Sequence, residues 1–324
     1  MDLGDPLVLL DPYNPDPPEW AVLAAEDVVR RVVEPDGAGM LPWRRHSASP
    51  PVLTVSDSYI VGTLDLRAVD YPYLLQFVRC RFERPPDLRQ AKLAGCEFSH
   101  CWLPGLAARN LRSESDLVIT ASTLSGRLDL VDATISGSLD LRRSTLDNPE
   151  GRALHADRLE LAGALLGGGL TVRGVLRIAG ARTGGNINLA GANLHNDNGL
   201  AFNGNGMHIG GNLICSRGED ATTPFRCTGL IYLPSSRIDS DFYLRGARLS
   251  PSAYRSPAAP NEDPEHDPVA VLVADRVTVT GNVVLDRNTT ATGTLRMVNA
   301  RIGGSLRLTA ASVDVTNHDG PHLA

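Results

Sequence analysis

The sequence predicts an all-β protein, a parallel β-helix built as a four-sided solenoid of about ten turns with an N-terminal capping helix. Three observations predict it. Related segments recur along the 324 residues, apolar residues come in short apolar-x-apolar triplets, and glycine, asparagine, aspartate and serine separate the triplets. An aromatic content of 5% fits a thin core with many turns.

Residues 1–50 are predicted to form an N-terminal arm and a capping helix, at about residues 17–33. Asp16 suits the N-cap, Pro17 the first helical position, and Glu19 completes a capping box. The helix would cover the open first turn, so that its strand edges do not pair with other molecules. Docking on a membrane is the alternative, but acidic side chains offset Arg30 and Arg31. The expected apolar face consists of Trp20, Leu23, Ala24, Val28 and Val32.

Residues 51–324 are predicted to form a single solenoid of five modules of roughly 48 residues. Leu106, Leu154 and Phe202 follow one another at equal intervals of one module. The interval from Phe202 to Leu272 is longer, because a segment rich in proline and charge is inserted at 250–268, which reads as a loop. Each module also opens with an interval of nine residues between an apolar anchor and a small residue. These intervals are Leu53 to Gly62, Leu106 to Ser115, Leu154 to Gly163, Phe202 to Gly211 and Leu272 to Gly281.

Within each module the triplets recur in steps of five and six residues. Neither a helical period nor long alternation persists, so each triplet is predicted to be a short strand, with a tight corner after it. Eight triplets between Leu154 and Phe202 fit two turns of a four-sided coil at about 24 residues each. A triangular coil is the alternative. Inward positions include Leu176, Ile178, Ile187 and Leu189.

The segment AKLAGCEFSHCWLPG keeps a pure five-residue step, with small Ala91, Cys96 and Cys101 alternating with large Leu93, Phe98 and Leu103. Over residues 78–105 the chain therefore resembles the pentapeptide-repeat proteins. That resemblance implies a right-handed four-sided β-helix. The longer modules look like Gly-rich β-helix proteins of actinobacteria, which are often labelled membrane-associated oxidoreductases.

The residues that could carry chemistry are predicted to be structural. Cys96, Cys101 and His100 are spaced closely enough for zinc, but the cysteines fall on inward positions and His100 on an outward one. The acidic loop Asn261–Asp267 lacks a calcium-loop spacing and reads as a solvated loop. We expect no catalytic residue, metal or cofactor. Five cysteines are assigned inward: Cys80, Cys96, Cys101, Cys215 and Cys227.

Charge and termini limit the partners. A net charge of -6 from 37 acids and 31 bases does not favour direct nucleic-acid binding. The N-terminus has no basic n-region and no apolar run is long enough to span a bilayer, so we expect a soluble cytoplasmic chain without a transmembrane segment. Because the last residues, NHDGPHLA, resemble a module opening, we expect either a longer natural protein or a last turn covered by another chain.

The middle residue of each triplet must point outward. One side is enriched in apolar residues, whereas the row on another side, which includes Asp129, His155 and Arg177, is mostly polar. We define the apolar stripe as Val118, Leu166, Ile214, Tyr243 and Val284. It is the predicted interface of a non-enzymatic interaction or scaffold module that binds a protein partner or itself; strand propensity alone is the competing explanation.

Two further functions remain open from the sequence. The pentapeptide-repeat resemblance implies a DNA-mimicking protein that binds topoisomerases, although bases such as Arg142 and Arg143 would interrupt an acidic row. An oxidoreductase or another β-helix enzyme is the other possibility. Asp129 and Asp140 are separated by about half a turn of the predicted coil, so they fall on opposite sides of it and cannot act as a pair.

Overall fold

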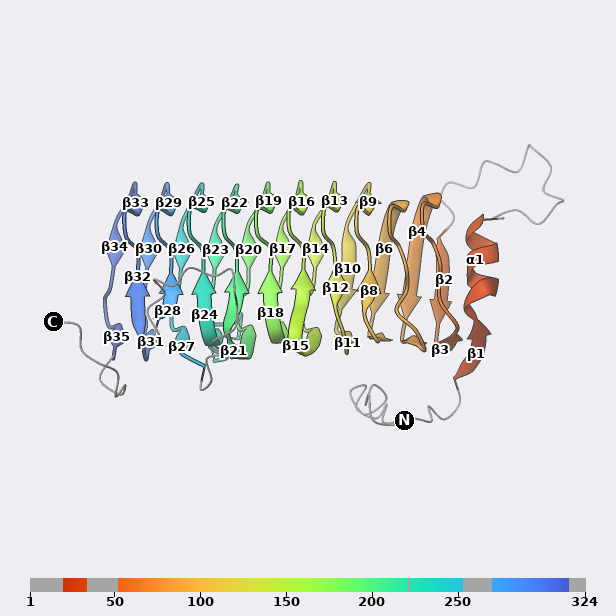
Figure 1. Ribbon diagram of the computed structural model, residues 1–324, viewed down its shortest axis with the longest axis horizontal. Coiled ribbons are helices and arrows are strands. Elements are labelled where there is room, and N and C mark those ends of the chain that lie inside the picture. Colours follow the sequence, from red (N-terminus) through yellow and green to blue (C-terminus); the bar gives the residue numbers. More distant parts are fainter. Residues whose placement is uncertain (1–19, 34–51, 221, 253–269, 315–324) are drawn as a thin grey trace.

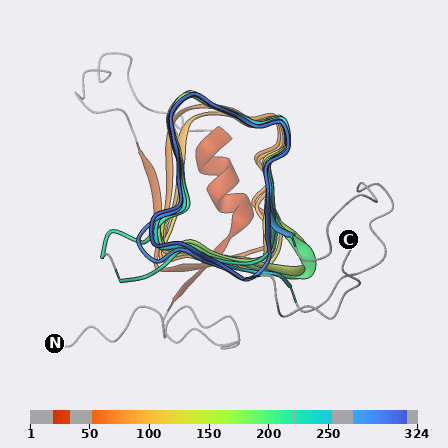
Figure 2. The same cartoon turned by 90° about the vertical axis from the view of Figure 1, so that its left-hand side faces the viewer.

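The computed structural model describes residues 20–33, 52–220, 222–252 and 270–314. These residues form a parallel β-solenoid of about 11 turns (Figure 1). Figure 2, which looks along the long axis, shows that the coils superimpose as a four-sided outline. The four-sided prediction is therefore confirmed and the triangular alternative is wrong.

Each side of the outline is a ladder of parallel strands, one from each coil. We number the coils 1 to 11 by their strand on side 1 and the sides in chain order. Side 1 contains β2 (Leu53–Ser56), the end of β4 (Asp70–Val78), the end of β6 (Lys92–Ser99), β10 (Leu117–Thr120), β14 (Leu139–Asp140), β17 (Leu165–Leu166), β20 (Ile187–Asn188), β23 (Leu213–Ile214), β26 (Phe242–Tyr243), β30 (Val283–Val284) and β34 (Leu306–Arg307). Side 2 contains β1 (Ala21–Ala24), β3 (Ser58–Val61), β5 (Arg81–Phe82), β7 (Trp102–Leu103), β11 (Thr123–Leu124), the starts of β15 (Thr145–His155), β18 (Thr171–Arg177), β21 (Asn193–Asn203) and β24 (Arg226–Tyr232), then β27 (Arg248–Ser250), β31 (Thr290–Ala291) and β35 (Ser312–Val313).

The other two sides complete each coil. Side 3 contains β8 (Leu106–Ala107), β12 (Leu128–Asp129), the ends of β15, β18, β21 and β24, then β28 (Ala270–Val273) and β32 (Thr294–Arg296). Side 4 contains the starts of β4 and β6, then β9 (Arg112–Ser113), β13 (Thr134–Ile135), β16 (Glu160–Leu161), β19 (Arg182–Thr183), β22 (His208–Ile209), β25 (Arg237–Ile238), β29 (Thr278–Val279) and β33 (Arg301–Ile302).

The register explains the length of the modules. Coils 5, 6 and 7 begin at Leu139, Leu165 and Ile187, so a longer coil is followed by a shorter one, and one module makes two coils. The extra residues of coils 5 and 7 leave the ladder at the corner between sides 2 and 3, after Asp147 and His195. Module anchors Leu106, Leu154, Phe202 and Leu272 all lie on side 3. The anchor Leu53 is the exception, since it pairs with Leu75 on side 1.

The N-terminal helix is shorter than predicted. Helix α1 spans Ala25–Val33, and the four residues before it form strand β1. They extend because β1 pairs in parallel with β3 and satisfies the edge of coil 1. Ala25, Val28 and Val32 of α1 are buried, and Figure 2 shows α1 lying across the outline of the coils. The predicted capping residues Asp16, Pro17 and Glu19 lie outside the described residues, as does most of the 250–268 loop.

The core is a narrow column of side chains from all four sides. Leu176, Ile178, Ile187 and Leu189 are each at most 1% exposed, as their inward assignment requires. Coils 2 and 3 contain a group of buried aromatic rings. There Phe98 stacks on Phe77 with ring centroids 5.1 Å apart, and Phe82 meets Phe98 edge-on at 5.8 Å.

A ladder of polar side chains joins the coils at the corner between sides 4 and 1. Asn186 Oδ1 accepts from the backbone N–H of Asn212 at 2.7 Å, and Asn212 Oδ1 accepts from that of Asp241 at 3.0 Å. Asn282 then donates to Asp241 and accepts from the backbone N–H of Ser305 at 3.0 Å. Each amide or carboxylate thereby satisfies a backbone donor of the next coil at a turn.

Candidate functional site

The apolar stripe lies on side 1, in one continuous ladder. Val118 pairs with Asp140, which in turn pairs with Leu166, and Asn188 separates Leu166 from Ile214. The stripe is therefore interrupted twice by polar residues. Its uninterrupted part covers coils 8 to 10 and consists of Ile214, Tyr243 and Val284.

Much of the stripe is shielded. Val284 is only 1% exposed, and Val118, Leu166, Ile214 and Tyr243 are partly buried. The Tyr243 hydroxyl donates to Asp241 Oδ2 at 2.5 Å, and the Arg245 guanidinium lies 4.7 Å from the Tyr243 ring centroid. The face thus combines modest apolar area with fixed polar groups.

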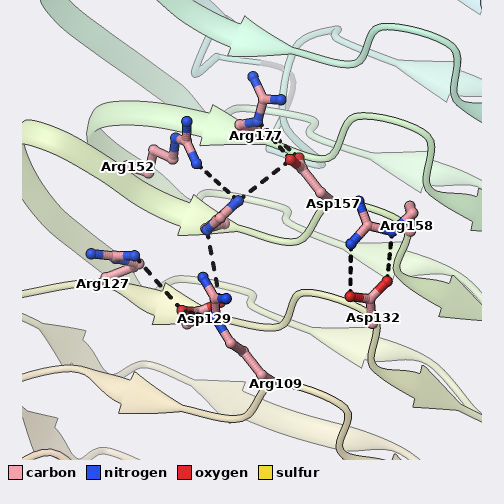
Figure 3. A network of polar contacts seen from close by, with 9 residues as sticks. Arg109, Arg127, Asp129, Asp132, Arg152, Asp157, Arg158 and Arg177 are labelled. Atoms are coloured by element: carbon pink, nitrogen blue, oxygen red, sulfur yellow. Dashed lines mark hydrogen bonds and ion pairs between the residues drawn. The ribbon is translucent and has the colours of Figure 1, made fainter.

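A polar cluster lies on side 3, where the sequence placed Asp129, His155 and Arg177 in one row. The β12–β15 and β15–β18 pairings set Asp129, His155 and Arg177 side by side on successive coils. His155 Nδ1 is 3.8 Å from Asp129 Oδ1, and His155 Nε2 is 3.4 Å from Asp157 Oδ2. Figure 3 shows the two carboxylates with arginines around them. Asp129 pairs with Arg109 at 2.8 Å, and Asp157 with Arg177 at 2.9 Å.

The two nitrogens of the imidazole have different neighbours. His155 Nε2 lies 3.0 Å from Arg152 Nη1 and 3.4 Å from Asp157 Oδ2. His155 Nδ1 faces Asp129 Oδ1 at a distance too long for a hydrogen bond. His155 Nδ1 and Asp129 Oδ1 are buried without a hydrogen-bond partner among the described residues. Burial, with a smaller contribution from Arg152, holds the pKa of His155 below its usual value, against the opposite effect of Asp157 and Asp129.

The cluster has the chemical groups of an acid–base site but not the access. The His155 side chain is 8% exposed and the two aspartates are 15% exposed, so a substrate has little of the imidazole to contact. Side-chain ion pairs occupy both carboxylates. The arrangement therefore fits a structural network of ion pairs that links neighbouring coils better than it fits a catalytic centre.

We expect the cluster to make stability depend on pH. The folded pKa of His155 lies below the unfolded value of about 6.5, so above that pH the imidazole is neutral in both states. As the pH falls below about 6.5, the unfolded chain takes up the proton first, and the free energy of unfolding decreases. His155→Gln removes this titration. Urea unfolding at pH 7.5 and pH 5.5 should show a smaller loss in the variant than in the wild type, and equal losses would contradict the assignment.

The cysteines and two further histidines lie outside this cluster, and Cys80 and Cys101 are in contact with each other, with Cys101 Sγ accepting from the Cys80 N–H at 3.4 Å. All five cysteines are free and buried, as predicted, and burial raises the pKa of the Cys96 and Cys215 thiols well above its usual range. His195 and His208 lie on sides 2 and 4, beside Asp197 and Asp239 respectively. No group of three or more histidine, cysteine, aspartate or glutamate side chains in the described part could hold a metal ion. The acidic loop Asn261–Asp267 lies outside that part.

Coil 11 exposes positions that are buried in coils 2 to 10. Leu306, Leu308 and Val313 are 51%, 54% and 47% exposed. Val283 and Ala291, which pair with Leu306 and Val313 in coil 10, are 0% and 1% exposed. We call Leu306, Leu308 and Val313 the open end. The triplet pattern predicts which side chains point inward, but it does not contain the exposure of Leu306 within the described structure.

Comparison with known proteins finds no match: no protein-family model fits the chain, and no curated protein or solved structure is significantly similar to it. Within the described ranges, none of the helical structure has the length and hydropathy needed to cross a membrane.

Proposed function

We propose that this protein is a non-enzymatic scaffold whose β-solenoid associates with a second copy of itself through the open end. The observation that carries the proposal is the exposure of Leu306 and Leu308, whose side chains would be buried in any further stack. Burying one large aliphatic side chain contributes about 1.5–3 kcal/mol. In the described structure, β33, β34 and β35 also pair on one face only. Their free backbone groups favour pairing with another strand.

The difference between the two ends favours a dimer over a filament. At coil 1, β1 pairs with β3, and α1 buries Val28 and Val32 over the column. A head-to-tail stack is therefore blocked by α1. An open end that meets another open end forms a two-fold contact, which closes after two copies.

The apolar stripe is the second candidate face for association, with a lateral contact instead of an axial one. Its uninterrupted part, Ile214 to Val284, is less exposed than the open end. The alternative of mimicking duplex DNA has less support, because arginines neutralise the aspartates. Asp57 pairs with Arg79, and Asp140 with Arg142. The enzyme alternative is weakened by the poor access to His155.

Sedimentation velocity over a range of protein concentrations tests the proposal. We expect the wild type to form a dimer, and the double variant Leu306→Asp with Leu308→Asp to raise the dimer dissociation constant at least about 100-fold, because four charges would face a buried contact. The matched control is Ile214→Asp with Val118→Asp, two outward positions of the stripe, which should leave the dimer intact. A wild type that is monomeric at all concentrations contradicts self-association. A dimer that only the stripe variant disrupts assigns the contact to side 1.

A further inference from the structure

A cavity of about 450 Å³ opens at the corner between sides 1 and 2, over coils 5 to 8. It is lined by Leu166, Gly168 and Ala190 of coils 6 and 7, by Arg142 and Arg143 of coil 5, and by a turn of coil 8 that includes Glu219 and that we call the lip. The volume is in the range of small-molecule sites. The cavity is remote from the open end, which lies three coils beyond it.

The cavity exists because one coil lacks side chains at this corner. In coil 5 the corner carries Arg142 and Arg143, whereas in coil 6 it is formed by Gly168 and Gly169. A Cβ atom added to Gly168 would have no neighbour closer than 3.9 Å, and one at Gly169 none closer than 3.6 Å. The missing side chains leave a notch between the arginines and the lip.

The lip is held in place by its own hydrogen bonds. The Gly218 N–H donates to the Thr223 carbonyl at 2.8 Å, and Asp220 accepts from the backbone N–H groups of Thr222 and Thr223, both at 3.0 Å. These bonds, with the two threonine hydroxyls, hold the pKa of Asp220 far below its usual value. Gly218 also packs closely against Gly191, where an added Cβ would lie 3.1 Å from the Gly218 Cα. The part of the cavity that coil 8 contributes is therefore preformed.

The walls carry opposite charges, and two of the charged groups are in no ion pair. Arg142 is engaged in a two-pronged contact with Asp140, with Nε at 2.9 Å from Oδ1. Arg143 and Glu219 form no ion pair with any other described residue. Asn188, which also lines the cavity, uses Oδ1 to accept from the Ala190 N–H at 3.0 Å, which leaves its amide N–H groups as donors. Leu166 supplies an apolar surface beside these groups.

We propose that this cavity binds a free amino acid in its zwitterionic form. The carboxylate would pair with Arg143 and the Asn188 amide, because a guanidinium and an amide are both donors to a carboxylate. The ammonium group would face Glu219. An aliphatic side chain would lie on Leu166 and Ala190, and the vacant corner at Gly168 supplies the room. A purely anionic ligand would be repelled by the carboxylate of Glu219, and a purely cationic ligand would be repelled by the guanidinium of Arg143.

Isothermal titration calorimetry with the full chain and the twenty common amino acids tests the inference, starting from leucine. We expect at least one aliphatic amino acid to bind, and Gly168→Leu, which fills the notch, and Arg143→Gln each to weaken binding at least about 10-fold. The matched control is Arg287→Gln, which removes an arginine from the same corner of coil 10, outside the cavity. It should bind as the wild type does. Gly168 has no positive φ, so a side chain there keeps the backbone unchanged.

Modified ligands test the two charges separately. N-acetyl-leucine lacks the ammonium and leucine amide lacks the carboxylate, so both should bind at least about 10-fold more weakly than leucine. No binding of any amino acid up to 10 mM, on the order of the weakest useful affinity, would overturn the inference. The inference would also be overturned if Gly168→Leu and Arg143→Gln both bound leucine as tightly as the wild type does, or if N-acetyl-leucine bound as tightly as leucine. None of these results depends on whether the protein forms a dimer.

Discussion

Phe98→Ala is expected to lower the free energy of unfolding by about 3–5 kcal/mol, measured by urea denaturation followed by circular dichroism. Phe98 is fully buried in coil 3, and its ring stacks on Phe77 and meets Phe82 edge-on. Removing it leaves a cavity beside the Phe77 and Phe82 rings. The backbone ladders on both sides hold the coils at a fixed spacing, so the cavity cannot collapse easily.

The matched control for Phe98 is Trp102→Ala. Trp102 lies on side 2 of the same coil but points outward, partly buried, with the Arg81 guanidinium 4.7 Å from its ring centroid. We expect it to cost about 1 kcal/mol, from the lost cation–π contact and some apolar area. Equal losses in the two variants would show that Phe98 does not belong to a tightly packed interior.

Gly174→Ala is expected to cost about 3 kcal/mol by the same measurement. Gly174 lies in β18 beneath the corner where coil 5 leaves the ladder, and its φ is +103°. A Cβ there would collide with the Asn148 carbonyl oxygen and lie 2.7 Å from that of Gly151. Both contacts are with backbone, which cannot rotate away, so the bulge of coil 5 would have to move.

Gly206→Ala separates collision from backbone strain. Gly206 also has a positive φ, +64°, but an added Cβ would have nothing within 4 Å. We expect a cost of roughly 1 kcal/mol, the usual strain of a left-handed residue with a side chain. If the two alanine variants unfold alike, the close approach of Gly174 to coil 5 is not a constraint on the fold.

The sequence predicted the architecture because side-chain direction in a solenoid depends on local alternation. The triplets placed Leu176, Ile178 and the five cysteines inward, and the structure buries them. The equivalence of Leu106, Leu154 and Phe202 also predicted real strand pairing. The assignment of residues 21–24 to the helix was wrong. Helical propensity is a local property, and it does not reveal that these residues pair with the exposed edge of β3 and form a strand there.

The sites could not be predicted in the same way. The row of Asp129, His155 and Arg177 was visible in the sequence, but the contact of His155 with Arg152 depends on the bulge that precedes it. The cavity beside Gly168 is lined by residues of coils 5 to 8, and the sequence around Gly168 does not indicate that a turn of coil 8, two coils later in the chain, contributes to it. The exposure of Leu306 depends on what lies next to coil 11 in space, which a local pattern does not contain.

The bulges of coils 5 and 7 show that the corner between sides 2 and 3 accepts extra residues. Strands before and after each bulge keep their partners in the adjacent coils, so the extra residues leave the stack undisturbed. Added peptide at this edge costs little beyond the entropy of closing the loop. Insertions at this corner are therefore expected to be tolerated. They could add new binding surface to the solenoid without any change to its core.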